Sequence, residues 1–209
     1  MARIAIAGSG YPGSTGLFVT DLARARGHEV LELTDLDHLP GLERQLAGAD
    51  AVVLVPKRGD AWRHAQQAAQ NLATAAALQA APVHLVLLSS FVVGHGLAHP
   101  LNRINESILP GRVAAERTLR TSGLPHTIVR TTWLTEDPAG VHAVTLTQDP
   151  HADGMLSRSD LAAVMLAAVE HPEARGTTFS LFNEPGEPPA DWADSFARLR
   201  PDTRNEDLT

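Results

Sequence analysis

The chain has 209 residues, no cysteine and a formal net charge of −7, and aromatic residues make up only 4% of it. Without cysteine it has no disulfide, zinc–thiolate site or cysteine nucleophile, and its negative charge argues against a nucleic-acid-binding surface. No apolar run is as long as a membrane helix, and the first residues lead directly into a strand pattern rather than a signal peptide. We therefore expect a cytoplasmic protein with no membrane or nucleic-acid partner and no metal site.

Short apolar runs alternate with helical patterns along the chain. The expected order is strand 3–7, helix 15–27, strand 28–34, helix 39–49, strand 50–56, helix 60–81, strand 83–90, helix 111–123, strand 126–134, helix 157–172, strand 177–183 and helix 189–200. Gly27 and Gly123 are expected to end their helices, and Asp60 and Ser157 to cap theirs, with Asp160 in capping-box spacing after Ser157. This alternation predicts a doubly wound, mostly parallel α/β sheet with helices on both faces.

We expect residues 1–209 to form one domain, because no repeat or low-complexity linker divides the chain. The last residues, 201–209, are polar and are expected to form a frayed tail.

A glycine-rich turn, "GSGYPGSTG", joins the first predicted strand to the first predicted helix. Gly8, Gly10 and Gly13 fit G-x-G-x-x-G, and Gly10, Gly13 and Gly16 fit a second spacing, G-x-x-G-x-x-G. Glycine permits a tight turn and removes the Cβ that would hold a pyrophosphate away, while the following helix offers free N–H groups and its positive dipole end. Phosphate binding is favoured over a turn that only needs positive φ. The cofactor-binding candidates are Gly8, Gly10, Tyr11, Pro12, Gly13, Ser14, Thr15 and Gly16.

The same turn is a near miss for the P-loop of nucleoside triphosphatases, because Ser14 stands where that motif needs lysine. We therefore favour a dinucleotide. Such sites use an acidic residue about twenty positions further on for the ribose hydroxyls, and Asp35 follows the second predicted strand. Asp35 favours NAD over NADP because it would repel a 2′-phosphate; the alternative is a turn or cap residue.

Several longer segments carry a family resemblance, above all "HPLN", "AERTLRTSGLPHTIVR", "LTEDP" and "SRSDLA". In these segments the chain resembles the atypical short-chain dehydrogenase/reductases, and within them the NAD(P)H-binding, NmrA-like branch. The resemblance covers most of the chain in collinear order. It implies a Rossmann-like domain in which residues 151–209 form a small part that covers the substrate.

The chain departs from that family in two informative ways. The segment after the second predicted strand is about twenty residues shorter than in relatives, roughly one helix and one strand, so we expect one edge strand–helix unit to be lost. Catalytic members also carry a Tyr-x-x-x-Lys pair, whereas Ile108 and Arg112 occupy the matching positions here. Tyr11 and Lys57 are the chain's single tyrosine and lysine, so no such pair exists. Arg112 is a candidate for holding a ribose or phosphate, with a helix-surface role equally open.

Ser89 and Ser90 end the predicted strand at 83–90, and His95 follows it. The resemblance places Ser89 and Ser90 beside the nicotinamide, with Ser89 as a cofactor-binding candidate and Ser90 as a weak catalytic one. His95 is the other weak catalytic candidate, because it follows the ligand-facing strand and can donate a proton.

These features predict an NAD(P)-binding oxidoreductase that passes hydride to a flavin, quinone or similar acceptor. The alternatives are a non-catalytic NmrA-like dinucleotide sensor with a regulatory protein partner, and a degenerate Rossmann domain with no cofactor.

Overall fold

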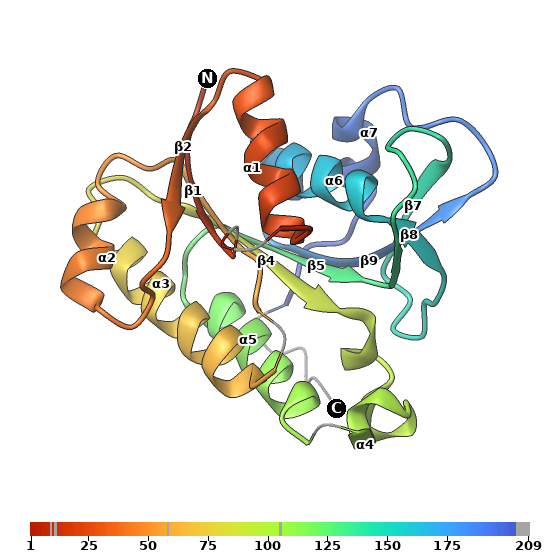
Figure 1. The fold of residues 1–209 in the computed structure, drawn as a ribbon, viewed down its shortest axis with the longest axis horizontal. Helices are drawn as coiled ribbons and strands as arrows, with labels where there is room; N and C mark the ends of the chain where they lie inside the picture. The colour runs from red at the N-terminus through yellow and green to blue at the C-terminus, as the bar shows by residue number, and fades with distance from the viewer. Residues whose placement is uncertain (9, 11, 58, 105, 204–209) are drawn as a thin grey trace.

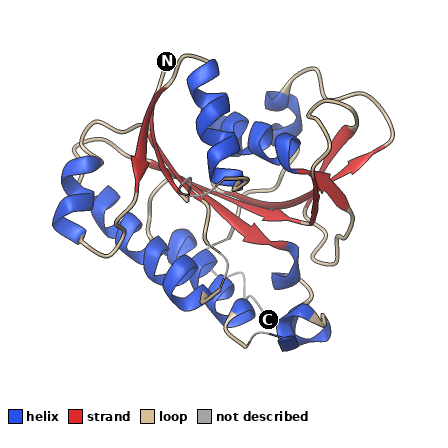
Figure 2. Cartoon of the chain, viewed as in Figure 1, coloured by secondary structure: helices blue, strands red, loops and turns tan. Residues whose placement is uncertain are grey.

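The computed structural model describes residues 1–8, 10, 12–57, 59–104 and 106–203. Its strands and helices alternate along most of the chain, as Figures 1 and 2 show. The strands are β1 (Arg3–Ala7), β2 (Glu29–Leu33), β3 (Ala51–Leu54), β4 (His84–Ser90), β5 (His126–Thr131), β6 (Trp133–Thr135), β7 (Ala143–Thr147), β8 (Met155–Ser157) and β9 (Thr177–Glu184). The α-helices are α1 (Thr15–Ala25), α2 (Leu39–Gln45), α3 (Ala68–Ala77), α4 (Leu101–Ile104), α5 (Ile108–Thr121), α6 (Arg158–Glu170) and α7 (Trp192–Ala197). A π-helix, η1 (Trp62–Gln67), and the 3₁₀ turns η2 (Phe91–Val93), η3 (Gly96–Ala98) and η4 (Pro172–Ala174) complete the set.

The main sheet has the order β2-β1-β3-β4-β5-β9-β7, and only the β7–β9 pair is antiparallel. Strands β6 and β8 form a separate two-stranded sheet. In the 3-2-1-4-5-6 order of Rossmann folds, another strand lies outside the second one. Within the described part of the chain β2 is the edge here, which confirms the predicted Rossmann-like sheet with one edge unit missing.

Helices cover both faces of the sheet, with α1, α6 and α7 on one and α2, α3 and α5 on the other (Figure 1). Strand residues alternate between two cores because successive side chains point to opposite faces. In β1, for example, Ile4 and Ile6 pack toward α1 and α6, whereas Ala5 and Ala7 pack toward α2 and α3. Burial on both sides explains why the parallel strands are almost continuously apolar.

The expected helix signals have structural counterparts. Gly27 and Gly123 adopt φ of +79° and +76° after α1 and α5, and Asp60 Oδ1 accepts from the N–H of Trp62 at 2.9 Å. The predicted helix at 60–81 begins as η1 before it continues as α3. At this point Gly111 of α5 packs so closely that a Cβ there would lie 2.6 Å from the carbonyl carbon of Ala61.

The region after β5 differs most from expectation. The strand predicted at 126–134 is divided into β5 and β6, and β7, β8 and the short elements between 91 and 104 were not predicted. Residues 151–209 were expected to form a small covering part, but β9 lies inside the main sheet and α6 packs on α1. Coverage of a substrate by this region stays a prediction.

The expected frayed tail is wrong at Asp202. Its Oδ2 accepts from Thr178 Oγ1 at 2.7 Å and contacts Arg120 Nε and His126 Nε2 at 3.3 and 3.2 Å. Burial opposes ionisation of Asp202, but hydrogen bonds from His126 and Thr178 and the positive charges of Arg120 and His126 outweigh it and lower its pKa. These contacts involve residues far away in sequence, so the local polar composition did not reveal them. Residues 204–209 lie outside the described part of the chain.

Among the described residues, the structure contains no helix long and apolar enough to cross a membrane.

Candidate functional site

The glycine turn follows β1 at the carboxyl end of the sheet. Gly8 has a φ of +106°, and a Cβ at this position would lie 2.0 Å from the carbonyl oxygen of Val55, just after β3. Glycine is therefore required at residue 8 for the turn to pass the neighbouring strand. At Gly10 and Gly13, by contrast, no described atom beyond the adjoining residues lies within 4 Å of the position that a Cβ would take. The turn is thus packed on one side and open on the other.

The first turn of α1 follows the glycine turn directly, and its residues Thr15 and Gly16 are buried. Ser14 is the N-cap, and its Oγ accepts from the N–H of Leu17 at 3.2 Å. The N–H groups of Thr15 and Gly16 belong to the first turn, where an α-helix provides no intrahelical acceptor. The predicted candidates from Gly13 to Gly16 therefore present backbone donors and a positive dipole end beside an open glycine turn. Pro12, which precedes Gly13, is exposed. Tyr11 lies outside the described residues.

A cavity of about 650 Å³ opens beside this turn at the carboxyl ends of β1, β2 and β3. Its lining residues are Gly8, Gly10, Leu33, Thr34, Asp35, Leu36, Asp37, Leu54, Val55, Pro56, Lys57, Arg63, His64 and Ala68. This volume is in the range of small-molecule and cofactor pockets. The structure thus brings two of the predicted turn glycines and Asp35 into one cavity.

The position of Asp35 is compatible with both roles that the sequence left open, and a contact with a ribose stays a prediction. Its Oδ1 accepts from the N–H of Asp37 at 3.0 Å, which is a turn interaction, and the residue also lines the cavity. The carboxylate of Asp37 pairs with Arg63 Nη2 at 3.0 Å. The cavity therefore carries acidic groups from the end of β2 and an arginine from the start of η1.

The hydroxyl of Ser89 is engaged in a buried contact, and cofactor binding by this residue stays a prediction. It is 1% exposed, and its Oγ donates to Glu116 Oε1 at 2.6 Å. Alternate residues of β4 face α5, and Ser89 is one of them. Glu116 also binds Arg130 Nη2 at 2.7 Å and Arg120 Nη2 at 3.2 Å, so Ser89 completes a buried ionic cluster.

Arg112 belongs to α5, and its side chain reaches the carboxyl end of β4, where it makes a structural contact. Its Nη1 donates to the carbonyl oxygen of Leu88 at 2.6 Å. Burial lowers the pKa of Arg112 to about 10 against the opposite effect of Glu116, so the guanidinium remains charged at neutral pH. A contact with a ribose or phosphate stays a prediction for this residue.

An aromatic and histidine cluster forms where β4 and β5 end. Ser90, the last residue of β4, leads into Phe91, whose ring centroid lies 5.5 Å from that of His95, 5.2 Å from that of His99 and 5.6 Å from that of Trp133. We refer to Phe91, His95, His99, Trp133 and His151 as the aromatic cluster; the His95 and His151 centroids are 5.4 Å apart. Within the described chain, these histidines do not form a group able to hold a metal ion.

The cluster is partly exposed. Trp133 is 42% exposed and pairs across the small sheet with Met155, which is 55% exposed. His95 Nε2 lies 3.4 Å from the carbonyl oxygen of Ala152, and His99 Nδ1 accepts from the N–H of Leu101 at 3.3 Å. Sequence reasoning identified His95 but not His151, because His151 approaches from a loop 56 positions away that carried no motif.

The motif segments "LTEDP" and "SRSDLA" meet near the start of α1. Arg158, the first residue of α6, contacts Glu136 through Nη2 at 2.7 Å and Nε at 3.0 Å, and its Nη1 lies 3.3 Å from Thr15 Oγ1. The hydrogen bond from Arg158 lowers the pKa of the Glu136 carboxyl. Sequence reasoning used these segments only as family markers, and it missed the arginine's position beside the candidate phosphate site.

Known proteins resemble this chain in sequence and in fold. A family model described as NAD(P)H-binding matches residues 13–172. The sanguinarine reductase of Eschscholzia californica is 32% identical over 124 residues, which cover 56% of this chain and 45% of that protein. An uncharacterized chloroplastic protein of Arabidopsis thaliana is 30% identical over 131 residues, 59% of this chain and 40% of its own. The chain thus spans less than half the length of these curated relatives.

Solved structures show the same fold at lower sequence identity. The oxidoreductase ylbE of Lactococcus lactis has a TM-score of 0.76 at 18% identity, over 88% of this chain and 92% of its own. ChuY of Escherichia coli O157:H7, described as an anaerobilin reductase, has a TM-score of 0.72 at 17% identity, over 88% and 100%. A short-chain dehydrogenase/reductase of Veillonella parvula in complex with NADP has a TM-score of 0.65 at 18% identity, over 91% and 99%.

Proposed function

The chain belongs to the NAD(P)H-binding family, and on that premise we propose that it is a reductase that passes hydride from a nicotinamide dinucleotide to a flavin, quinone or similar acceptor. The observation that carries the proposal is the arrangement along the carboxyl edge of the sheet. An open glycine turn and a cavity with Asp35 lie at the ends of β1 to β3, and the aromatic cluster lies at the ends of β4 and β5. In doubly wound folds, ligands bind outside this edge.

The residues present suit the two halves of such a cofactor. The cavity at the end of β2 would take the adenosine, with the Asp35 carboxylate accepting from ribose hydroxyls. The turn from Gly8 to Gly16 would take the diphosphate, because Gly10 and Gly13 leave room for it and α1 supplies N–H donors. The bound cofactor supplies the hydride, and the protein's contribution is to hold it against the acceptor.

The aromatic cluster supports an acceptor with a planar face. Phe91 and partly exposed Trp133 offer flat apolar surfaces, and His95 and His99 offer ring N–H groups to a substrate that gains a proton. Two of the similar proteins are themselves described as reductases. The chain has no Tyr-x-x-x-Lys pair, which disfavours alcohol–ketone interconversion and favours acceptors that can take their proton from water or histidine.

We further propose a preference for NAD, because the Asp35 carboxylate in the cavity would repel a 2′-phosphate. Arg63 lines the same cavity but pairs with Asp37, so a carboxylate already neutralises part of its charge.

The second candidate is a dinucleotide sensor without catalysis, which the absent Tyr–Lys pair favours. Fluorescence titration with NADH and NADPH, followed by assays of coenzyme oxidation with flavins and quinones, separates the possibilities. Binding with turnover supports the reductase, and binding without turnover supports the sensor. If neither coenzyme binds, the domain is a degenerate Rossmann fold and both proposals are wrong.

The aromatic cluster gives a sharper test of the reductase. We expect His95→Gln to lower kcat for a quinone with little change in coenzyme affinity, because His95 lies at the acceptor end. His142→Gln is the matched control, since His142 is exposed on the connection between β6 and β7. Equal kcat values for both variants would exclude His95 as a proton donor.

A further inference from the structure

Arg158 is held at the start of α1 although it belongs to α6. Its side chain is only 14% exposed, and its Nη1 lies 3.3 Å from the Oγ1 of Thr15, the first residue of α1. Glu136 holds the other side of the guanidinium, yet the Glu136 side chain is 69% exposed. The Arg158 side chain is therefore mostly buried, whereas Glu136 is a surface partner whose carboxylate a ligand can displace from the guanidinium.

A polar network fixes this position. Ser157 Oγ donates to the carbonyl oxygen of Asp137 at 2.7 Å, and Asp160 Oδ1 accepts from the N–H of Gly140 at 2.8 Å. Asp160 Oδ2 also accepts from Asn183 Nδ2 at 2.9 Å. Asp160 has the capping-box spacing, but its carboxylate does not accept a hydrogen bond from the N–H of Ser157. That N–H donates to Asn183 Oδ1 at 2.6 Å instead.

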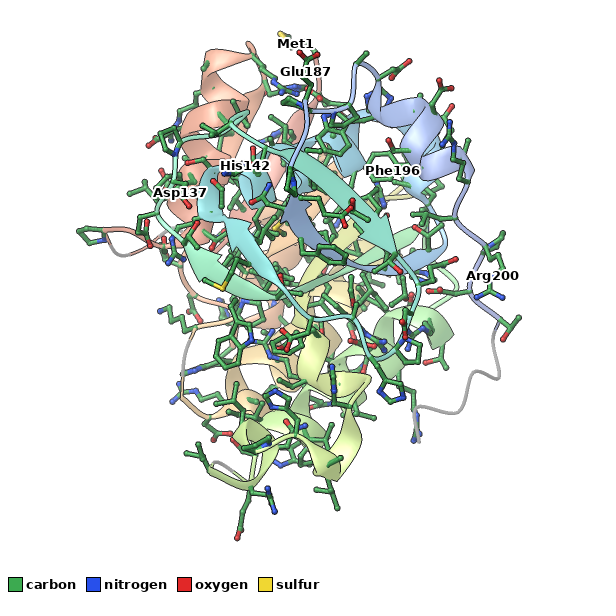
Figure 3. All side chains as sticks on the ribbon, turned by 90° about the vertical axis from the view of Figure 1, so that its right-hand side faces the viewer. Met1, Asp137, His142, Glu187, Phe196 and Arg200 are labelled. Carbon is green, nitrogen blue, oxygen red and sulfur yellow. The ribbon has the colours of Figure 1, made fainter. Side chains whose placement is uncertain are left out.

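This network joins two segments that are distant in sequence. The connection between β6 and β7, on which Figure 3 labels Asp137 and His142, is bound to the first turn of α6. Ser157 and Asp160 are 1% and 4% exposed, so the base of Arg158 rests on a buried and hydrogen-bonded support. The guanidinium of Arg158 therefore has little freedom to move away from α1.

The positive charge of Arg158 matters at this position because of the composition of the glycine turn. The turn from residue 8 to residue 16 contains no lysine or arginine, so its own attraction for phosphate comes from uncharged donors, namely backbone N–H groups and hydroxyls, and from the helix dipole. A guanidinium presents planar donors suited to a phosphate group, and such charge-assisted bonds are among the stronger polar contacts. Arg158 supplies the positive charge that the turn lacks.

We propose that Arg158 is a binding residue for the diphosphate of the dinucleotide, and that Glu136 keeps its guanidinium in place until a phosphate oxygen replaces the carboxylate. This rests on the proposed dinucleotide function. Its distinguishing consequence is that the two members of the ion pair act in opposite senses. Loss of Arg158 weakens coenzyme binding, whereas loss of the Glu136 charge removes a competitor and does not.

The test measures dissociation constants for NADH, NADPH and ADP-ribose with the full chain and its variants Arg158→Gln, Arg158→Lys and Glu136→Gln. ADP-ribose retains the diphosphate but lacks the nicotinamide. Arg26→Gln is the matched control, because Arg26 pairs with Glu170 at 2.6 Å beside the other end of α1. Thermal unfolding of each variant shows whether it is folded.

We expect Arg158→Gln to weaken all three ligands about 10- to 100-fold, Arg158→Lys to be intermediate, and Arg26→Gln to match wild type. Glu136→Gln is expected to bind as tightly as wild type or more tightly. Unchanged affinity in folded Arg158→Gln or Arg158→Lys would overturn the assignment, and so would equal weakening by Arg158→Gln and Glu136→Gln, which indicates a purely structural ion pair. If wild type binds no coenzyme, the proposed function itself is wrong.

Discussion

Alanine at each of three turn glycines should separate folding from coenzyme binding. At Gly8 the positive φ would cost alanine about 1–2 kcal/mol, and its Cβ would lie 2.0 Å from the Val55 carbonyl oxygen. That approach is about 1.5 Å inside normal contact, and backbone cannot move aside as a flexible side chain can. Overpacking of this kind adds about 1–3 kcal/mol.

The expected total for Gly8→Ala is therefore about 2–5 kcal/mol, which lowers Tm by about 4–20 °C for a chain of this size. Gly13 has a φ of +75° but no described atom within 4 Å of its Cβ position, so Gly13→Ala should lose only about 1–2 kcal/mol. Gly10 has neither problem in the described structure, and Gly10→Ala should leave Tm within about 2 °C.

Coenzyme binding should follow a different order. Gly10→Ala places a methyl group where the diphosphate must approach the backbone, so we expect it to weaken NADH binding by about tenfold or more while the protein stays fully folded. Differential scanning calorimetry and fluorescence titration measure the two effects. A Gly8→Ala variant as stable as wild type would refute the packing argument, and unchanged NADH affinity in Gly10→Ala would refute the placement of the diphosphate.

Three further predictions concern the ionic cluster, pH and cofactor choice. Glu116→Gln should lower the free energy of unfolding by about 3–5 kcal/mol in urea titrations, because it leaves Arg120 and Arg130 without their buried carboxylate; a loss below about 1 kcal/mol would contradict this. Burial, together with the charges of Arg175 and His126, lowers the pKa of His84 to about 3. The unfolded chain therefore takes up a proton at this residue as pH falls below about 6.5, whereas the folded chain does not. Between pH 7.5 and pH 5 the free energy of unfolding of wild type should fall by about 2 kcal/mol more than that of His84→Gln. Asp35→Ser should raise NADPH affinity relative to NADH by about tenfold because it removes a carboxylate from the cavity; an unchanged ratio of the two dissociation constants would exclude Asp35 as the selecting residue.

Features that depend on local chemistry were predictable from the sequence. The glycine turn, the helix stops at Gly27 and Gly123 and the cap at Asp60 are each decided by neighbours a few positions away. The parallel strands were also evident, because strands buried on both faces become continuous apolar runs. By contrast, β7 is a half-buried antiparallel edge strand and β8 has only three residues, so neither produced a clear pattern.

The surroundings of Ser89 and the residues that the sequence did not indicate depend on register and on distant contacts. Ser89 and Ser90 are adjacent in sequence, but β4 turns them to opposite faces, and only the three-dimensional packing shows that Ser89 meets Glu116. Arg158 lies 143 positions from Thr15, and Asp202 lies 82 positions from Arg120. No local propensity indicates such pairs, because each depends on how α6 or the chain's end packs on the sheet.

The missing Tyr–Lys pair has a consequence for which acceptors the proposed reductase would use. A ketone needs a proton delivered to its oxygen as hydride arrives, and here the side chains near the acceptor end that could deliver one are histidines of the aromatic cluster. A quinone or flavin spreads the incoming charge over a conjugated ring system and can be protonated afterwards by water. The rate with such acceptors should therefore fall only partly in His95→Gln, because water can replace the histidine as proton donor, whereas reduction of a simple ketone should be slow. Rapid ketone reduction that persists in His95→Gln would show that a proton donor outside the cluster serves the site, and the aromatic cluster would then be a binding surface alone.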